Sequence, residues 1–260
     1  MSEERRHWLE KALNASFDGQ EDPNKVIKKA VVEMSEGRIS AGLDLLDYAS
    51  DFPDCAENFD QLGALGPLVR LVGSSDNNIV RRALEVLTMY LPNNPKVQLA
   101  AALRQDCLTF LKGAIARYSQ DPVTVHFSLS AMGSLVRNVA SLENSFIMTG
   151  GVEYLCTLGF NSTDNKIVQK IAAILSSLMQ GNDLSERKGQ IESFVVNTFK
   201  SPSFPKDNIQ FWEIMSSLGM SLQGNSSIQS ALKDRKQWIM TLPAGEEGDF
   251  KSELETLSSI

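Results

Sequence analysis

The stretch "NSFIMTGGVEYL", residues 144–155, places two glycines between two apolar segments that each have a helical pattern. A glycine inside a helix costs about 1 kcal/mol relative to alanine, so a pair of them marks a break between helices. The same order of features occurs earlier in "NFDQLGALGPLV", residues 58–69. A break that recurs in this way indicates an internal repeat. We expect the glycines to let one short helix turn sharply into the next.

Long helical patterns recur at a regular distance along the chain. Five segments carry apolar residues at the i, i+3/i+4, i+7 spacing of an amphipathic helix. Their central residues are Leu46, Leu87, Met132, Leu175 and Met215, which lie 41, 45, 43 and 40 residues apart. A period of roughly 40 to 47 residues is typical of helical solenoids of the armadillo and HEAT kinds. Two shorter helical patterns separate successive long ones, which favours the three-helix armadillo repeat.

The sequence therefore predicts an all-α protein, an armadillo-like right-handed helical solenoid of about four three-helix repeats with helical N- and C-terminal caps. We expect a helical cap over residues 1–37, the solenoid over residues 38–223, and a C-terminal helical cap and tail over residues 224–260. In the first cap, residues 5–17 have a helical pattern, and Asp22-Pro23 has the chemistry of a helix start.

Composition and charge narrow the class of function. Hydrophobic residues make up 42% of the 260 residues, which is enough for a folded core, and the net charge is −7. Residues 1–60 contain 14 acidic and 7 basic side chains, so they carry the whole of that net charge. Nucleic-acid binding needs a clustered excess of Lys and Arg, which an acidic first part and a neutral remainder do not provide. We therefore do not expect the protein to bind nucleic acid. No window reaches 18 apolar residues and the first residues are charged, so we expect no membrane span and a cytoplasmic location.

Catalytic and metal-binding patterns are missing from the sequence. The two histidines, His7 and His126, have no Cys, His or acidic residue at metal-ligand spacing. No phosphate-binding glycine loop and no nucleophile elbow occurs. Cys55, Cys107 and Cys156 lie about 50 residues apart, which is typical of isolated core thiols in a reducing compartment. We therefore expect a protein that is not an enzyme and holds neither a metal nor a cofactor.

The long third helix of each repeat is the element expected to bind a partner. In an armadillo stack these helices line the concave surface, which is the usual binding surface of a solenoid. Their outward positions are polar and of mixed charge, which favours a protein partner. The candidate partner-binding residues are Arg81, Arg82, Glu85, His126, Ser130, Arg137, Gln169, Lys170, Gln210 and Glu213.

Two kinds of partner are compatible with such a surface. Armadillo proteins that carry peptides into the nucleus place a Trp and an Asn on each third helix. Here the tryptophans are Trp8, Trp212 and Trp238, and only Trp212 falls on a predicted third helix. This disfavours an extended peptide and favours a folded partner held by a short clamp. A scaffold or adaptor that binds a peptide or protein in its concave groove stays open as the alternative.

Several segments together resemble one known family. They are "RRHWLEKAL", "EDPNKVIKKAVVEM", "GLDLLDYASDFPDCAENFDQLGALGPLVRLV", "VTVHFSLSAMGSLVRN" and "ALKDRKQW". They look like the cytosolic nucleotide-exchange factors of the 70-kDa heat-shock chaperone that are of armadillo type, the Hsp70-binding-protein and yeast Fes family. The resemblance extends over roughly residues 5–240. It implies a monomeric co-chaperone whose four-repeat clamp embraces lobe II of the chaperone's ATPase domain and promotes the release of ADP.

Overall fold

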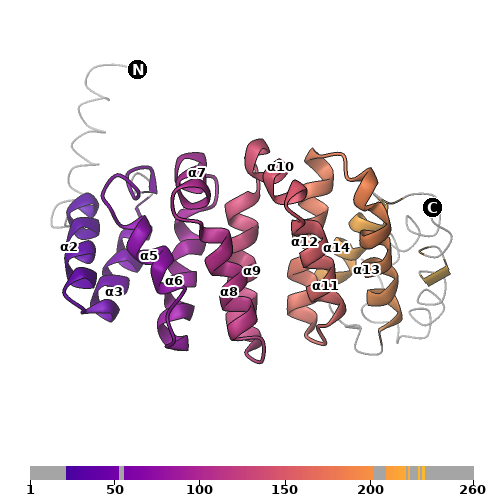
Figure 1. Ribbon diagram of the computed structural model, residues 1–260, viewed down its shortest axis with the longest axis horizontal. Helices are drawn as coiled ribbons and strands as arrows, with labels where there is room; N and C mark the ends of the chain where they lie inside the picture. Colours follow the sequence, from indigo (N-terminus) through magenta and orange to yellow (C-terminus); the bar gives the residue numbers. More distant parts are fainter. Residues whose placement is uncertain are drawn as a thin grey trace, which may run out of the picture.

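The chain folds as a row of helices in a computed structural model that describes residues 22–52, 56–201 and 209–220, with residues 222, 228, 230 and 231. Within these residues the regular elements are all helical, and they follow one another along the longest axis of the molecule (Figure 1). The all-α helical solenoid predicted from the sequence is therefore confirmed. The helix predicted over residues 5–17 and most of the predicted C-terminal cap lie outside the described residues.

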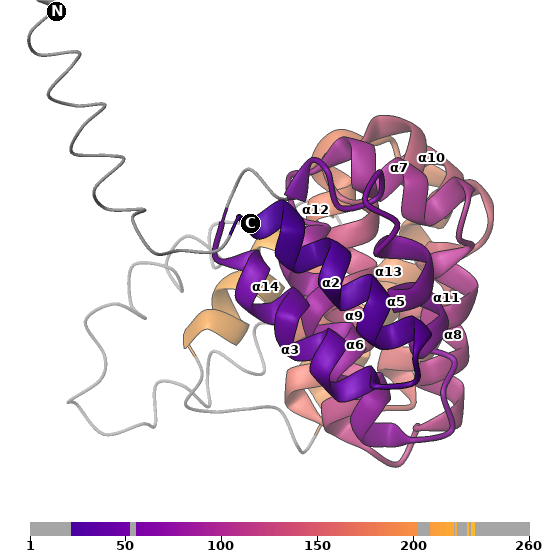
Figure 2. The ribbon, with the colours of Figure 1, turned by 90° about the vertical axis from the view of Figure 1, so that its left-hand side faces the viewer.

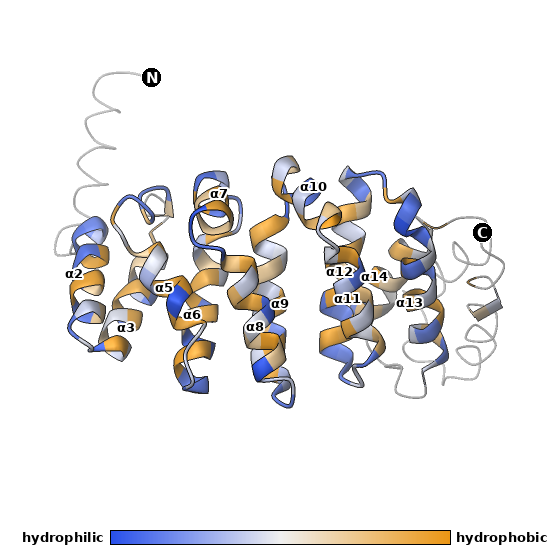
Figure 3. Ribbon diagram, viewed as in Figure 1, coloured by the Kyte–Doolittle hydropathy of each residue, from blue (hydrophilic) through white to orange (hydrophobic). Residues whose placement is uncertain are grey.

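The long helices form a continuous ladder through the molecule. Each packs against the next in chain order. Their central residues, the five that defined the repeat in the sequence, are all completely buried. The ladder consists of α3 (Ile39–Ser50), α6 (Asn77–Tyr90), α9 (Pro122–Val136), α12 (Asn165–Gly181) and α14 (Ile209–Met220). Figure 3 shows both hydrophilic and hydrophobic residues on each of these helices, as a one-sided core contact requires.

The remaining helices cover the other sides of this ladder. In Figure 2, which looks along the row, α5, α8 and α11 lie opposite α3, α6 and α14, and α7 and α10 lie at one edge. The helix α2 packs along α3 at the start of the row. The remaining helices are α2 (Pro23–Ser35), α5 (Leu65–Leu71), α7 (Pro95–Leu103), α8 (Cys107–Arg117), α10 (Ala140–Met148), α11 (Gly151–Phe160) and α13 (Lys188–Lys200).

The three-helix repeat is complete only in the middle of the row. In the first repeat, the short helix predicted over "DCAENFDQLG", residues 54–63, is largely absent, because residues 57–63 form turns. In the last repeat, the corresponding place is taken by the single 3₁₀ turn η1 (Ser185–Arg187). Repeats at the ends of a solenoid have only one neighbour and are commonly irregular.

Aspartate side chains fix where the long helices begin. Asp76, Asp121 and Asp164 precede α6, α9 and α12, and each carboxylate accepts a hydrogen bond from a backbone N–H in the first turn. Asp22 does the same for α2, with Pro23 at the first helical position as predicted. These caps satisfy N–H groups that have no partner inside the helix. They set the register in which one long helix lies beside the next.

The glycine pair that marked the repeat has two separate roles. Gly150 has φ +77°, in the left-handed region that glycine adopts without strain, and it precedes α11. Gly151 needs its small size, because a Cβ atom there would lie 2.4 Å from the Phe146 ring. In the first repeat, the left-handed glycine is Gly63, with φ +81°, whereas Gly66 lies inside α5. The predicted turn from one short helix into the next is found at Gly150, between α10 and α11, whereas Gly63 follows turns and Gly66 lies within a helix.

Candidate partner-binding surface

The predicted contact residues lie along one side of the helix ladder. We call this side, formed by the exposed positions of α3, α6, α9, α12 and α14, the third-helix face. Nine of the ten predicted residues have described side chains there, and all nine are at least partly exposed. For Glu213 the structure describes only the backbone, within α14. The binding role of this surface stays a prediction, and the bonds of its side chains differ from place to place.

Arg81 is used inside the protein, where it ties α6 to α9. Its Nη2 donates to Asp121 Oδ2 at 2.6 Å, and its Nε lies 3.1 Å from both Asp121 Oδ2 and Thr124 Oγ1. Asn77 Nδ2 donates to the same carboxylate oxygen at 2.6 Å. Burial alone would raise the pKa of Asp121, but the hydrogen bonds from Arg81, Thr124 and Asn77 outweigh it and hold that pKa well below its usual range.

Arg82 forms an ion pair across the contact between α3 and α6. We call the contact between two successive long helices a seam. The Arg82 guanidinium pairs with Asp44 of α3, and both side chains are substantially exposed. Such an exposed pair contributes less than about 1 kcal/mol to stability. It does neutralise the charge of Arg82 before any partner arrives. Glu85, one turn further along α6, has no ion pair within the described part of the chain.

Between α9 and α12 the cations are not neutralised. His126 and Arg137 belong to α9 and its end, and Lys166 and Lys170 to α12; we call these four residues the basic seam. Burial and the nearby ammonium groups of Lys170 and Lys166 lower the pKa of His126, and the Asp164 carboxylate opposes this shift. Burial and the Arg137 guanidinium lower the pKa of Lys170. Among the described residues, none of the four forms an ion pair.

The backbones that carry the basic seam approach each other closely. A Cβ atom on Gly133 of α9 would lie 3.0 Å from Cγ1 of Ile174 on α12, and 3.6 Å from Nη2 of Arg137. Glycine at this position therefore lets the two helices meet and leaves room for the Arg137 side chain. Because the helices are in contact, the cations on either side of the seam are held near one another.

Gln98 fixes the end of α9. This α7 side chain is only 1% exposed, and its Nε2 donates to the carbonyl oxygens of Ser134 at 2.7 Å, Leu135 at 3.2 Å and Arg137 at 2.8 Å. The last carbonyls of a helix have no partner inside it, so a buried amide donor satisfies them. Gln98 thereby holds the backbone from which Arg137 projects.

Asp44, Gln98 and Lys166 were not among the residues predicted from the sequence. Gln98 had a visible signal, since it is a single amide in the otherwise apolar "VQLAAAL". Asp44 and Lys166 had none, because each matters only through a helix about 40 residues away in the sequence. Predicted residues that the structure does bring together are His126, Arg137 and Lys170.

The other half of the third-helix face is partly apolar. Tyr48 of α3 and Met89 of α6 are 44% and 46% exposed, and they occupy equivalent places, two residues after Leu46 and Leu87. The face thus changes along the row. Aromatic, thioether and acidic groups lie on α3 and α6 together with the two ion-paired arginines of α6, and basic groups that form no ion pair within the described residues lie on α9 and α12.

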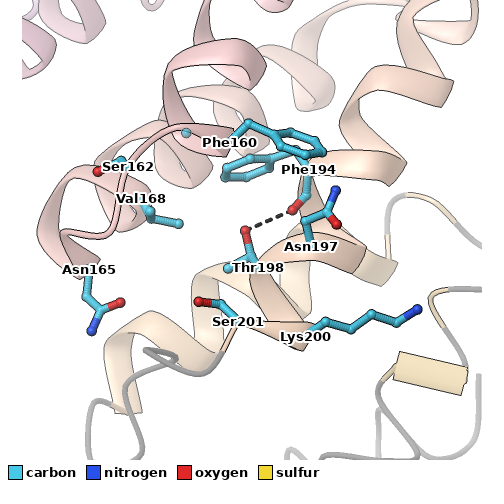
Figure 4. Close-up of a pocket in the computed structure, with 10 residues that line it drawn as sticks. Phe160, Ser162, Asn165, Val168, Phe194, Asn197, Thr198, Lys200 and Ser201 are labelled. Atoms are coloured by element: carbon cyan, nitrogen blue, oxygen red, sulfur yellow. Dashed lines mark hydrogen bonds between the residues drawn. The ribbon is translucent and has the colours of Figure 1, made fainter.

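A cavity of about 320 Å³ between α11, α12 and α13 offers no catalytic chemistry (Figure 4). The rings of Phe160 and Phe194 lie on one side of it, and Thr198 Oγ1 donates to the Phe194 carbonyl at 2.8 Å. Its lining residues include no histidine, cysteine or carboxylate.

Elsewhere, the described residues hold no cluster of three or more potential metal ligands. Burial raises the pKa of the Cys107 and Cys156 thiols to about 12, so neither is a nucleophile. In the described part of the chain, no helix is both long and apolar enough to cross a bilayer.

Comparison with known proteins gives a family match and a fold match. Residues 55–201 match the model of the SIL1/FES1/HPBP1 C-terminal domain. The nucleotide exchange factor SIL1 of Xenopus laevis is 23% identical over 197 residues, which is 72% of this chain and 41% of that protein. The chain therefore spans about two fifths of the length of that relative.

Solved structures of designed armadillo repeat proteins have the same fold. One of them, determined in complex with the peptide (KR)4, covers 92% of this chain and 99% of its own with a TM-score of 0.62 at 12% identity. An engineered protein covers 92% and 94% with a TM-score of 0.64 at 19% identity. These likenesses show that the helical solenoid is of armadillo type.

Proposed function

We propose that this chain, which belongs to the SIL1/FES1/HPBP1 family, is a nucleotide exchange factor that binds the ATPase domain of a 70-kDa heat-shock chaperone and promotes the release of ADP. The observation that carries the proposal is the match of the family's domain to residues 55–201, which hold α6, α9 and α12 with most of the third-helix face. A relative in the same comparison is itself named a nucleotide exchange factor.

The mechanism that fits these residues is binding, with no chemical step by this chain. An exchange factor must bind the open, nucleotide-free chaperone more tightly than the closed, loaded one. Linkage makes the effect reciprocal, so that ADP weakens binding of the exchange factor by the factor by which the exchange factor weakens ADP. A ~100-fold change corresponds to about 2.7 kcal/mol, which a few contacts made only in the open state can supply.

The third-helix face is the surface proposed to make those contacts. It combines exposed Tyr48 and Met89 with the cations of the basic seam, which form no ion pair within the described part of the chain. A face with both kinds of group suits a folded protein surface, since interfaces combine an apolar centre with polar surroundings. The proposed contacts remain those predicted from the sequence, with lobe II as their target. The division at residues 37 and 223 is likewise a proposal.

A displacement experiment tests the function. The chaperone's ATPase domain is loaded with fluorescent ADP, mixed with this protein and excess unlabelled nucleotide, and the release rate is recorded. We expect the rate to rise with the concentration of this protein and to saturate. We also expect added ADP to dissociate the complex. An affinity for the chaperone that is the same with and without ADP would mean a passive binder, and the scaffold or adaptor alternative would replace the exchange factor.

The remaining expectations are separate proposals with simple measurements. A monomer is tested by sedimentation at the concentrations used for exchange. The absence of a reaction of its own is tested by incubating the protein alone with ATP. The cytoplasmic location is tested by imaging the tagged protein in cells.

A further inference from the structure

Three of the four seams between successive long helices differ in how their charged side chains are paired. On the seam between α3 and α6, Arg82 pairs with Asp44. On the seam between α6 and α9, Arg81 pairs with Asp121. On the seam between α9 and α12, the cations face one another without a carboxylate partner in the described residues. Arginines are thus neutralised by aspartates at two seams, whereas the positive charges at the third seam have no ion-pair partner among the described residues.

One acidic group, Asp164, lies at the end of the basic seam. Asp164 precedes α12, and its Oδ1 accepts hydrogen bonds from the backbone N–H groups of Lys166 at 2.8 Å and Ile167 at 3.2 Å. Its charge acts on His126, whose pKa it raises, but it forms no ion pair with a cation of the seam. Arg137, Lys166 and Lys170 present three positive charges. Arg137 and Lys170 are partly buried and Lys166 is exposed, so screening by solvent is weaker around the first two than at a fully exposed site.

We infer that the basic seam is a binding site for a cluster of carboxylates on the protein partner. This inference rests on the proposed function for the identity of that partner, and it adds the chemistry by which the partner is recognised. Lys166 and Lys170 are one helical turn apart, so their ammonium groups match carboxylates spaced by about 6 Å. A helix with acidic residues at i and i+4 has that spacing, as do alternate residues of a strand.

The partner is a better occupant than this chain's own acidic residues. The excess negative charge of the chain belongs to residues 1–60, and the described part of them forms α2 and α3 at the opposite end of the row from α12 (Figure 1). Charges separated by several Debye lengths, each about 10 Å at 0.1 M salt, do not neutralise one another. Complementary charge on a partner would also steer its approach and fix its orientation on the third-helix face.

A pair of matched charge reversals tests the inference. The first variant is Lys166→Glu with Lys170→Glu, on the basic seam. The control is Lys25→Glu with Lys29→Glu, which makes the same change in net charge at the same i, i+4 spacing on the exposed side of α2. Affinity for the chaperone's ATPase domain is measured between 50 and about 500 mM salt. We expect the seam variant to bind about 10- to 100-fold more weakly at low salt, with a flatter salt dependence. The control should stay within about threefold of the unmodified protein.

A second probe separates this inference from the proposed function. A hexaglutamate peptide is titrated into the protein while the ring protons of His126 are followed by NMR. Bound carboxylates should raise the pKa of His126, and the seam variant should lose the response while the control keeps it. If the protein speeds ADP release but the seam variant and the control bind the chaperone equally, the inference is wrong and the proposed function stands. If the peptide binds at the seam but the chaperone does not bind at all, the proposed function fails.

A last test concerns the carboxylates in the C-terminal part of this chain. Glu246 and Glu247 lie outside the described residues, and their replacement by Gln removes two carboxylates. We expect this change to leave affinity for both probes unaltered. A gain in affinity would show that the tail occupies the basic seam, and it would overturn the assignment to a partner.

Discussion

A single substitution should neutralise one of the three cations of the basic seam. Asp44 lies two residues before Leu46, and its partner Arg82 lies five residues before Leu87. In the pair formed by α9 and α12, the same places are occupied by Ser130, two residues before Met132, and by Lys170, five residues before Leu175. The register therefore predicts that Ser130→Asp places a carboxylate beside Lys170, as Asp44 lies beside Arg82.

The size of the effect follows from the exposure of the two groups. Opposite charges about 4 Å apart attract by about 1 kcal/mol in water and by about 4 kcal/mol at an effective dielectric constant of 20. Measured exposed pairs contribute roughly 0.2 to 1 kcal/mol after the cost of ordering the side chains. Lys170 is half-buried, so we expect the upper part of that range for stability. Loss of one cation from the seam should weaken binding of an acidic partner about fivefold, the equivalent of about 1 kcal/mol.

The assay combines an NMR titration with binding. A carboxylate near Lys170 should raise the pKa of His126, because positive charges around that imidazole now help to lower it. Ser130→Asn is the control, since it has the same shape without the charge. The binding loss should shrink in about 0.5 M salt, where the Debye length is only a few ångströms. The same pKa of His126 in both variants, together with equal affinities, would falsify the register argument.

Three further predictions concern the bonds that hold the solenoid together. Asp121→Asn should destabilise the protein by about 1–3 kcal/mol at pH 7, measured by urea unfolding. Because the folded-state pKa of Asp121 is lowered, its contribution is present above the unfolded pKa near 4 and is lost as the pH falls through the folded value, so the variant should be less sensitive to acid. Gly151→Ala should lower the melting temperature through its clash with a buried ring, whereas Gly113→Ala, inside α8 with open space around it, should raise stability by about 0.5–1 kcal/mol. Gln98→Glu should cost more stability than Gln98→Met, since a carboxylate cannot donate to the carbonyls at the end of α9; the reverse order would contradict the assigned hydrogen bonds.

The architecture was predictable because it depends on local chemistry. Apolar residues at helical spacing identify each long helix, and their burial is what makes the helices pack. The aspartate caps and the left-handed glycines act within a few residues of themselves, so their signals are visible in a short stretch of sequence. Asp106 shows the limit of this, because it adopts φ +48° at a junction where the other repeats have glycine.

The candidate site was predictable only in part, for a physical reason. Whether a cation is free depends on which side chain lies beside it on the next helix, about 40 residues away. Arg82 and Lys170 have the same place in the helical pattern, five residues before Leu87 and Leu175, yet Arg82 forms an ion pair with Asp44 and Lys170 forms none in the described residues. Whether a cation has a carboxylate partner becomes visible only when the side chains of the adjacent long helix are placed beside it.

The free charges of the basic seam are held in place by uncharged residues. Gln98 binds the carbonyls at the end of α9, and Gly133 lets α9 and α12 come into contact, so the Arg137 backbone and the α12 lysines have fixed relative positions. Charges that are already in position lose little freedom when a partner binds, and that saving appears as affinity. The proximity of like charges costs some stability, which the ion pairs of Arg81 and Arg82 on the neighbouring seams help to offset. Cations at similar places in successive repeats thus have two different roles. A cation that faces a carboxylate of this chain contributes to stability, and a cation that faces none is available to bind a partner.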